Sequence, residues 1–156
     1  MAIATQLKQY LTQQGAQYEL LTHPHSGSSM ETAQAAHIPG DRLAKAVVVT
    51  DGTSYYVVAI PSDHHVDLGA LHSHLQRPVG LATEADTRPL FPDCELGAIP
   101  PLGAAYGLQT LWDAALAQQP EVFLEAGDHE LLLRIGVEEF QRLLGEAAQG
   151  HFSRHL

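Results

Sequence analysis

Two runs rich in β-branched residues, 44–50 and 54–60, flank the short turn Asp51-Gly52-Thr53. Runs of this kind joined by an Asp-Gly turn are typical of a β-hairpin. The chain is therefore expected to contain a sheet that includes this hairpin.

The remaining elements follow from apolar spacing and from turn residues. Apolar residues at helical spacing predict a first helix from Ile3 up to Gly15, and Ser28 or Ser29 can cap a second one that ends before Pro39. Further helices are expected at 67–75, from 83 and after 136, and further strands at 17–21, 79–82, 108–112, 121–126 and 130–135.

Strands outnumber helices in this pattern, and hairpins join some of them. This favours an α/β (α+β) fold with a mixed, largely antiparallel sheet or open barrel flanked by helices. The length suits one domain, expected over residues 1–150, with a loose C-terminal tail at 151–156.

The charge balance limits the partners. Eight basic and 18 acidic residues give a formal net charge of −10 with neutral histidines. Such a field repels nucleic acid, so any RNA contact is expected to be local, weak or assisted by a partner. The lone Cys94, a polar N-terminus and the lack of a long apolar run indicate a soluble, cytoplasmic protein with neither a membrane nor DNA as a partner.

Lys45 is the first candidate functional residue. It is one of only two lysines, and strand alternation places it on the same face as Val47 and Val49. A lysine on a half-buried face can point at a ligand phosphate or carbonyl group. The alternative is a strand-end lysine whose stem packs while its ammonium reaches water.

Two loops are further candidates. Residues 97–103 place two prolines between two glycines, and this stiff segment can present backbone amides at Gly97, Ala98, Ile99, Leu102 and Gly103. The turn Gly127-Asp128-His129 puts an acid beside an imidazole. Taken alone, the first is equally typical of a rigid connection and the second of a solvated hairpin turn.

Histidines at 23, 25, 64, 65, 72 and 74 raise the question of a metal site. None of them fits a His-Glu-x-x-His pattern, and no cysteine cluster accompanies them. We expect surface histidines, with no metal and no cofactor. No serine-nucleophile or dinucleotide-binding motif is present in the sequence.

Taken together and in order, these segments resemble the YbaK / prolyl-tRNA synthetase-associated domain family, also called the insertion-like editing superfamily. The resemblance covers about residues 3–145. It rests on residues 18–23, on the helix-to-strand stretch 31–45 that ends at Lys45, and on the segments 81–84, 97–103 and 123–131.

The resemblance implies hydrolysis of the ester that joins a mischarged small amino acid to the 3′ end of tRNA. It implies Lys45 as the essential residue, orienting the terminal nucleotide or the ester. It also implies an aminoacyl-tRNA synthetase as a candidate partner. The substrate-binding residues that it implies, including Ala46 beside the lysine, are Met30, Ala33, Ala46, Gly97, Ala98, Ile99, Pro100, Pro101, Gly103, Gly127, Asp128 and His129.

Two other functions stay open at this point. Ala46, where some family members carry a polar residue, and the acidic charge are compatible with a non-catalytic module that binds a nucleotide, an aminoacyl derivative or a protein. The ten histidines also allow a pH responder, because protonating all of them brings the formal charge to zero.

Overall fold

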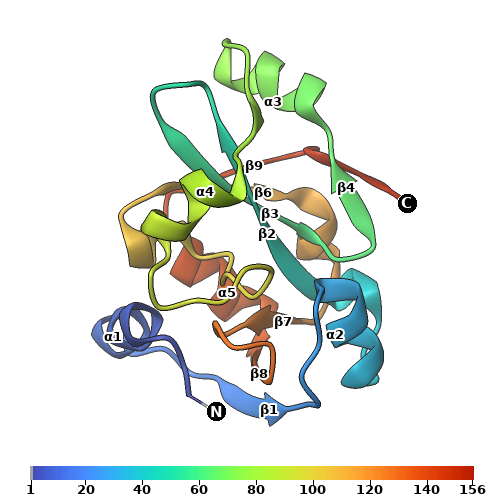
Figure 1. Ribbon diagram of the computed structural model, residues 1–156. Coiled ribbons are helices and arrows are strands. Elements are labelled where there is room, and N and C mark those ends of the chain that lie inside the picture. Colours follow the sequence, from blue (N-terminus) through green and yellow to red (C-terminus); the bar gives the residue numbers. More distant parts are fainter. Residues whose placement is uncertain (1) are drawn as a thin grey trace.

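The computed structural model describes residues 2–156 and contains both helices and strands (Figure 1). The helices are α1 (Thr5–Gln13), α2 (Ser29–Ala35), α3 (Leu68–Leu75), α4 (Glu84–Thr87) and α5 (Val137–Leu144). The strands are β1 (Glu19–Thr22), β2 (Leu43–Thr50), β3 (Tyr55–Pro61), β4 (His64–Val66), β5 (Gly80–Leu81), β6 (Gln109–Asp113), β7 (Glu121–Glu125), β8 (Leu131–Gly136), β9 (Ala148–Gly150) and β10 (Ser153–His155). None of the helices within residues 2–156 is long and apolar enough to cross a bilayer.

Most strands form one mixed sheet in the order β1-β8-β7-β2-β3-β6-β9, with β5 paired to β2. The pairs β1/β8, β7/β8, β2/β3 and β2/β5 are antiparallel. The pairs β2/β7, β3/β6 and β6/β9 are parallel. The expectation of a mixed, largely antiparallel sheet flanked by helices is confirmed.

The predicted hairpin forms the centre of this sheet. Strands β2 and β3 pair from Ala44 opposite Pro61 to Thr50 opposite Tyr55. The turn is held by Asp51, whose Oδ1 accepts hydrogen bonds from the amides of Thr53 at 2.8 Å and Ser54 at 2.7 Å. The short side chain of aspartate suits this local bonding, which is why such residues favour turns.

Side-chain caps fix the starts of three helices where the sequence places them. Ser28 accepts a hydrogen bond from the amide of Glu31, Asp67 from that of Ala70, and Thr83 from that of Asp86. Each bond satisfies an amide that the first helical turn leaves without a partner. The start of α2 matters most here because this helix covers the candidate site.

The two faces of the sheet bury different clusters. On one face, Leu43, Phe123 and Leu132 pack beneath Ala33 of α2, and further along Val49 and Val58 pack against Leu71 of α3. On the other face, α1 and α5 pack against the sheet in a larger cluster. Its members include Leu7, Leu11, Ala44, Leu124, Phe140 and Leu143. Because β2 alternates, its odd-numbered residues face α2 and α3, and its even-numbered residues face away from them.

The expected loose tail at 151–156 is wrong. Strand β10 pairs antiparallel with β4, and Phe152 is 3% exposed within the cluster under α3. Asp113 Oδ2 accepts hydrogen bonds from the Phe152 amide and the Ser153 hydroxyl, each at 2.8 Å. A buried aromatic ring and a buried carboxylate acceptor therefore order a segment that looks polar in the sequence.

Candidate functional site

Lys45 lies in β2 on the face that α2 and α3 cover, with Val47 and Val49, as its alternation predicts. The side chain is half-buried, and its Nζ donates a hydrogen bond of 3.4 Å to the carbonyl oxygen of Ser62. Burial lowers the pKa of Lys45, and the nearby Asp63 carboxylate partly opposes that shift. The ammonium is therefore held among protein groups beside α2.

A hollow of about 330 Å³, which we call the α2 hollow, adjoins two neighbours of Lys45, although Lys45 itself is not among its lining residues. It is lined by Met30, Glu31, Ala33, Gln34, Ile38, Gly40, Ser62 and Asp63. Two of these, Ser62 and Asp63, are the neighbours of the Lys45 ammonium. The structure thus brings three residues singled out from the sequence, Met30, Ala33 and Lys45, to one region.

The loop 97–103 is less open than the sequence suggests. Only Gly97 is exposed, and Ala98 to Gly103 are buried. The amide of Ala98 donates to the Glu95 carbonyl at 3.1 Å, and that of Gly103 to Thr110 Oγ1 at 2.9 Å. The expectation that these two amides are free to bind a ligand is wrong, because the loop uses them to hold its own shape.

The same loop packs mainly on the face of β2 away from Lys45. Ile99 lies in a cluster with Val48 and Val57, against which Ala46 also packs. Pro100 and Pro101 are buried. Lys45 and most of the double-proline loop are therefore on opposite sides of β2, and Gly97 is the part of the loop that reaches the segment before α2.

The turn at 127–129 supports the contact between Gly97 and the segment before α2. His129 is 3% exposed with a positive φ of 60°, and its Nε2 lies 2.6 Å from the Leu96 carbonyl oxygen. A Cβ on Gly97 would lie 3.1 Å from His129 Cε1 and 3.5 Å from the Gly27 carbonyl oxygen. The imidazole thus braces the loop end beside α2 and is not the solvated side chain of an ordinary hairpin turn.

The neighbours of His129 shape the same turn. Asp128 Oδ1 accepts hydrogen bonds from the amides of Glu130 and Leu131, each at 2.9 Å. Gly127 has a φ of +112°, and a Cβ there would come within 2.9 Å of the Ala4 Cβ. The glycine is required by both conformation and space.

Glu125 is a candidate that the sequence analysis missed. This last residue of β7 is completely buried. Within residues 2–156 neither of its carboxylate oxygens makes a hydrogen bond of good geometry, although the Thr32 hydroxyl lies close enough to interact with the carboxyl group. Burial raises its pKa to about 7, the nearby Thr32 hydroxyl lowers it in part, and Asp128 adds to the rise. The only signal was an acidic residue ending the apolar run Val122-Phe123-Leu124.

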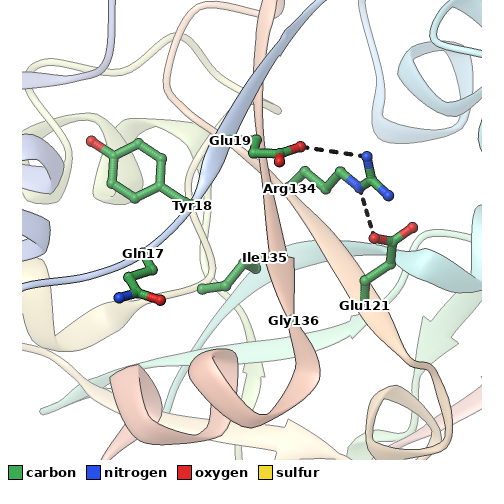
Figure 2. A pocket seen from close by; sticks show the side chains of 7 residues that line it. All are labelled: Gln17, Tyr18, Glu19, Glu121, Arg134, Ile135 and Gly136. Atoms are coloured by element: carbon green, nitrogen blue, oxygen red, sulfur yellow. Dashed lines mark hydrogen bonds and ion pairs between the residues drawn. The ribbon is translucent and has the colours of Figure 1, made fainter.

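A second groove, of about 420 Å³, is lined by residues of β1, β7 and β8, among them Glu19, Glu121 and Arg134 (Figure 2). Arg134 crosses it between two carboxylates, with its Nε 2.7 Å from Glu121 and its Nη1 3.4 Å from Glu19. A guanidinium engaged in this way is a poor phosphate site, because the two carboxylates offset its charge and occupy its Nε and Nη1 donors.

Most other arginines are also in ion pairs. Arg77 contacts Asp51 at 2.8 Å, Arg142 contacts Glu139 at 2.6 Å, and Arg154 contacts Asp67 at 3.1 Å. These pairs leave few cations for an RNA backbone. The surface of the folded protein therefore carries the net negative charge that the sequence predicts.

The histidines do not gather into a metal site, and the expectation that they lie on the surface is wrong for His23, which is 6% exposed. Within residues 2–156, no group of three or more His, Cys, Asp or Glu side chains is arranged to hold a metal ion. His64 and His155 instead flank Asp63, at 3.8 and 3.3 Å from its carboxylate oxygens, and link β4 to β10.

Comparisons with known proteins relate the whole arrangement to one family. The profile described as "Aminoacyl-tRNA editing domain" matches residues 23–143. Curated proteins give no significant match.

Solved structures share the fold. A hypothetical protein has a TM-score of 0.85 at 20% identity, covering 96% of this chain and 99% of its own. A protein described provisionally as a trans-editing enzyme for prolyl-tRNA synthetase has a TM-score of 0.84 at 24% identity, covering 97% and 96%. A protein from Marinobacter aquaeolei VT8, described provisionally as a signal transduction protein, has a TM-score of 0.75 at 21% identity, covering 97% of this chain but 31% of its own.

Proposed function

The chain belongs to the aminoacyl-tRNA editing domain family, and from this membership we propose that it is an aminoacyl-tRNA deacylase acting in trans. Its substrate is the ester between a mischarged small amino acid and the 3′ end of tRNA. The observation that carries the proposal is the half-buried Lys45 ammonium beside the α2 hollow.

The chemistry suits this arrangement. An aminoacyl ester is already activated, so that holding it and a water molecule beside fixed donors supplies much of the required rate. Lys45 can orient the terminal nucleotide or the ester carbonyl through its positive charge. Gly97, held by His129 near Gly27, supports the segment that leads into α2.

Side-chain selection is assigned to the α2 hollow. Met30 and Ala33 line this hollow of about 330 Å³ from α2, so their side chains are the ones that would limit the size of the bound amino acid. A pocket of this kind discriminates a single methylene by about 1–3 kcal/mol.

The acidic surface bears on how tRNA arrives. A formal charge of −10 and arginines held in ion pairs oppose independent capture of RNA. We infer that an aminoacyl-tRNA synthetase delivers the substrate, in the cytoplasm where charged tRNA is made and used.

The test is a deacylation screen with alanyl-, cysteinyl-, seryl- and threonyl-tRNA. Wild-type protein should release at least one amino acid, and Lys45→Ala should reduce that rate at least about 100-fold, as expected for loss of a reaction-centre donor. Lys8→Ala, which removes the other lysine from the exposed side of α1, is the matched control and should retain the rate.

Folded wild-type protein that leaves all four esters intact would rule out deacylation of these substrates. If a non-hydrolysable aminoacyl-adenosine amide raises the melting temperature and none of the four esters is hydrolysed, the chain is instead a non-catalytic binding module. A rate that depends on Lys45 excludes that module.

A further inference from the structure

The buried polar atoms that lack partners have one property in common. In residues 2–156 they are His23 Nε2, Asp63 Oδ1, both carboxylate oxygens of Glu125, and His129 Nδ1. The Nδ1 of His23 lies 2.8 Å from the Pro24 carbonyl oxygen, and the Nε2 of His129 lies 2.6 Å from that of Leu96. Because a carbonyl only accepts, those nitrogens carry the protons, and the opposite nitrogen of each neutral ring is an acceptor.

When Glu125 is ionised, every unpartnered buried side-chain atom in the described chain is thus an acceptor. Buried polar groups in native proteins are nearly always paired, and an exception calls for an explanation such as a water, an ion, a ligand or a functional role. The missing partner here has to be a donor. An anion such as a phosphate does not satisfy any of these atoms, whereas an ammonium group, with three donors and no acceptor, does.

Three of these groups lie at one end of the sheet. Glu125 ends β7 opposite Leu132, and Leu132 lies opposite Leu21 of β1, two residues before His23. The amide of His23 donates to the Glu130 carbonyl, next to His129. By strand alternation His23 and Glu125 both face α2.

Glu125 is also the register neighbour of Lys45. The parallel β2/β7 ladder ends with Ala44 opposite Leu124, so the next position on each strand is Lys45 and Glu125. Their side chains have different surroundings, because Lys45 is turned towards Ser62 and Asp63 while Glu125 has Thr32 of α2 as its polar neighbour. A cation and a carboxyl group thus flank the place where the two strands stop pairing.

An aminoacyl ester presents groups that are complementary to both. The phosphate and ester lie on one side of its α-carbon, and an α-ammonium group lies on the other. We propose that Glu125 is the substrate-binding residue that receives this α-ammonium group; the assignment rests on the proposed deacylase function. A buried carboxyl acceptor is complementary to a positively charged donor. This explains why a carboxyl group lies at the end of an apolar strand.

Helix α2 controls access to this carboxyl group. Ala33 lines the α2 hollow, and the adjacent Thr32 on the same helix is the polar neighbour of Glu125. An amino acid entering from the hollow reaches Glu125 when the first turn of α2 moves aside. Such an opening breaks the Ser28 cap and the Ser26–Thr32 hydroxyl contact of this seven-residue helix.

The decisive experiment is a cycle of two enzymes and two substrates. Wild-type and Glu125→Gln proteins are assayed on an aminoacyl-tRNA and on its N-acetyl derivative, in which the amine is a neutral amide. Glutamine keeps the shape and removes the charge. Glu125→Gln should lower kcat/KM for the free-amine substrate about 10- to 100-fold, the range for a lost hydrogen bond to a charged group, and leave the N-acetyl substrate unchanged.

Equal loss on both substrates, or loss on neither, would overturn the assignment and leave Glu125 as a structural or hydrated carboxyl group. Glu121→Gln is the matched control, since it removes the same charge from the same face of β7, where Glu121 pairs with Arg134. It should leave the preference for the free amine intact. Circular dichroism and thermal unfolding establish that each variant is folded.

A binding measurement separates this proposal from the deacylase proposal. The probe is alanyl-3′-amino-3′-deoxyadenosine, a non-hydrolysable amide with a free α-amine, compared with its N-acetyl form. Stabilisation of wild-type protein by the free amine, lost in Glu125→Gln, supports the assignment even if no ester is hydrolysed. Equal stabilisation of the two proteins overturns it even if hydrolysis is found.

Discussion

The ammonium of Lys45 is hydrogen-bonded to the backbone carbonyl of Ser62 at 3.4 Å, across the junction between β3 and the α2 hollow. The contact directs the lysine towards one side of the hollow. It also places the ammonium near the carboxylate of Asp63, which raises the pKa that burial lowers. The protonation of Lys45 therefore depends on Asp63.

Asp63→Asn should shift the alkaline limb of the kcat/KM profile to lower pH. Removing the carboxylate removes the effect that raises the Lys45 pKa, so the ammonium loses its proton at a lower pH. The measurement is deacylation from pH 6 to 10. Asp86→Asn, the same change at an exposed position of α4, should leave the profile in place, and an unmoved limb in Asp63→Asn would contradict the coupling.

The buried Glu125 carboxyl should make stability fall as pH rises. Its pKa is about 7 in the folded state against an ordinary value of 4.5, so between these pH values the folded protein keeps a proton that the unfolded chain has lost. The free energy of unfolding should decline over this window by about 3 kcal/mol relative to Glu125→Gln and level off above about pH 7. Urea unfolding at pH 4.5, 6, 7 and 8 measures the difference, and parallel curves for the two proteins would refute it.

Gly97→Ala should weaken the loop that approaches α2. The position has a φ of +81°, and the added Cβ would lie 3.1 Å from the His129 ring. A left-handed conformation costs a non-glycine residue about 1–2 kcal/mol, which should appear as lost stability together with lower deacylation. Gly80→Ala is the control, because Gly80 has open space around it and no positive φ. Equal stability of the two variants would show that the loop tolerates the change.

Phe152→Ala should destabilise the protein by about 3–5 kcal/mol, the range for removing a buried aromatic side chain. The ring is 3% exposed and packs in the cluster under α3. His151→Ala changes the exposed neighbour and should cost little. Chemical denaturation measures both, and a small effect at Phe152 would restore the loose tail expected from the sequence.

Sequence patterns predicted the elements that local residues determine. The Asp51 turn, the caps at Ser28, Asp67 and Thr83, and the long hairpin each depend on neighbours a few residues away. The short strands β4, β9 and β10 were missed, because three residues carry too little periodicity and their pairing depends on distant partners such as Asp113.

The candidate site divides in the same way. The position of Lys45 on its strand face followed from alternation, whereas Met30 and Ala33 were expected only from the family resemblance. The sequence could not show that Ala98 and Gly103 use their amides internally, since their acceptors lie on Glu95 and Thr110 and depend on the folded loop. Nor could it show that Glu125 is left without a donor, because that is a property of everything packed around it.

The order of strands in the sheet has a consequence for synthesis of the protein. Strand β1 pairs with β8, and the last pair joins Thr22 to Leu131, so an early segment has no partner until most of the chain has been translated. At about 5–20 residues per second, the wait between these two residues is roughly 5–20 seconds. During that interval residues 19–22 expose an unpaired edge on the ribosome, and slow or paused translation would lengthen the time in which a nascent chain can associate with another.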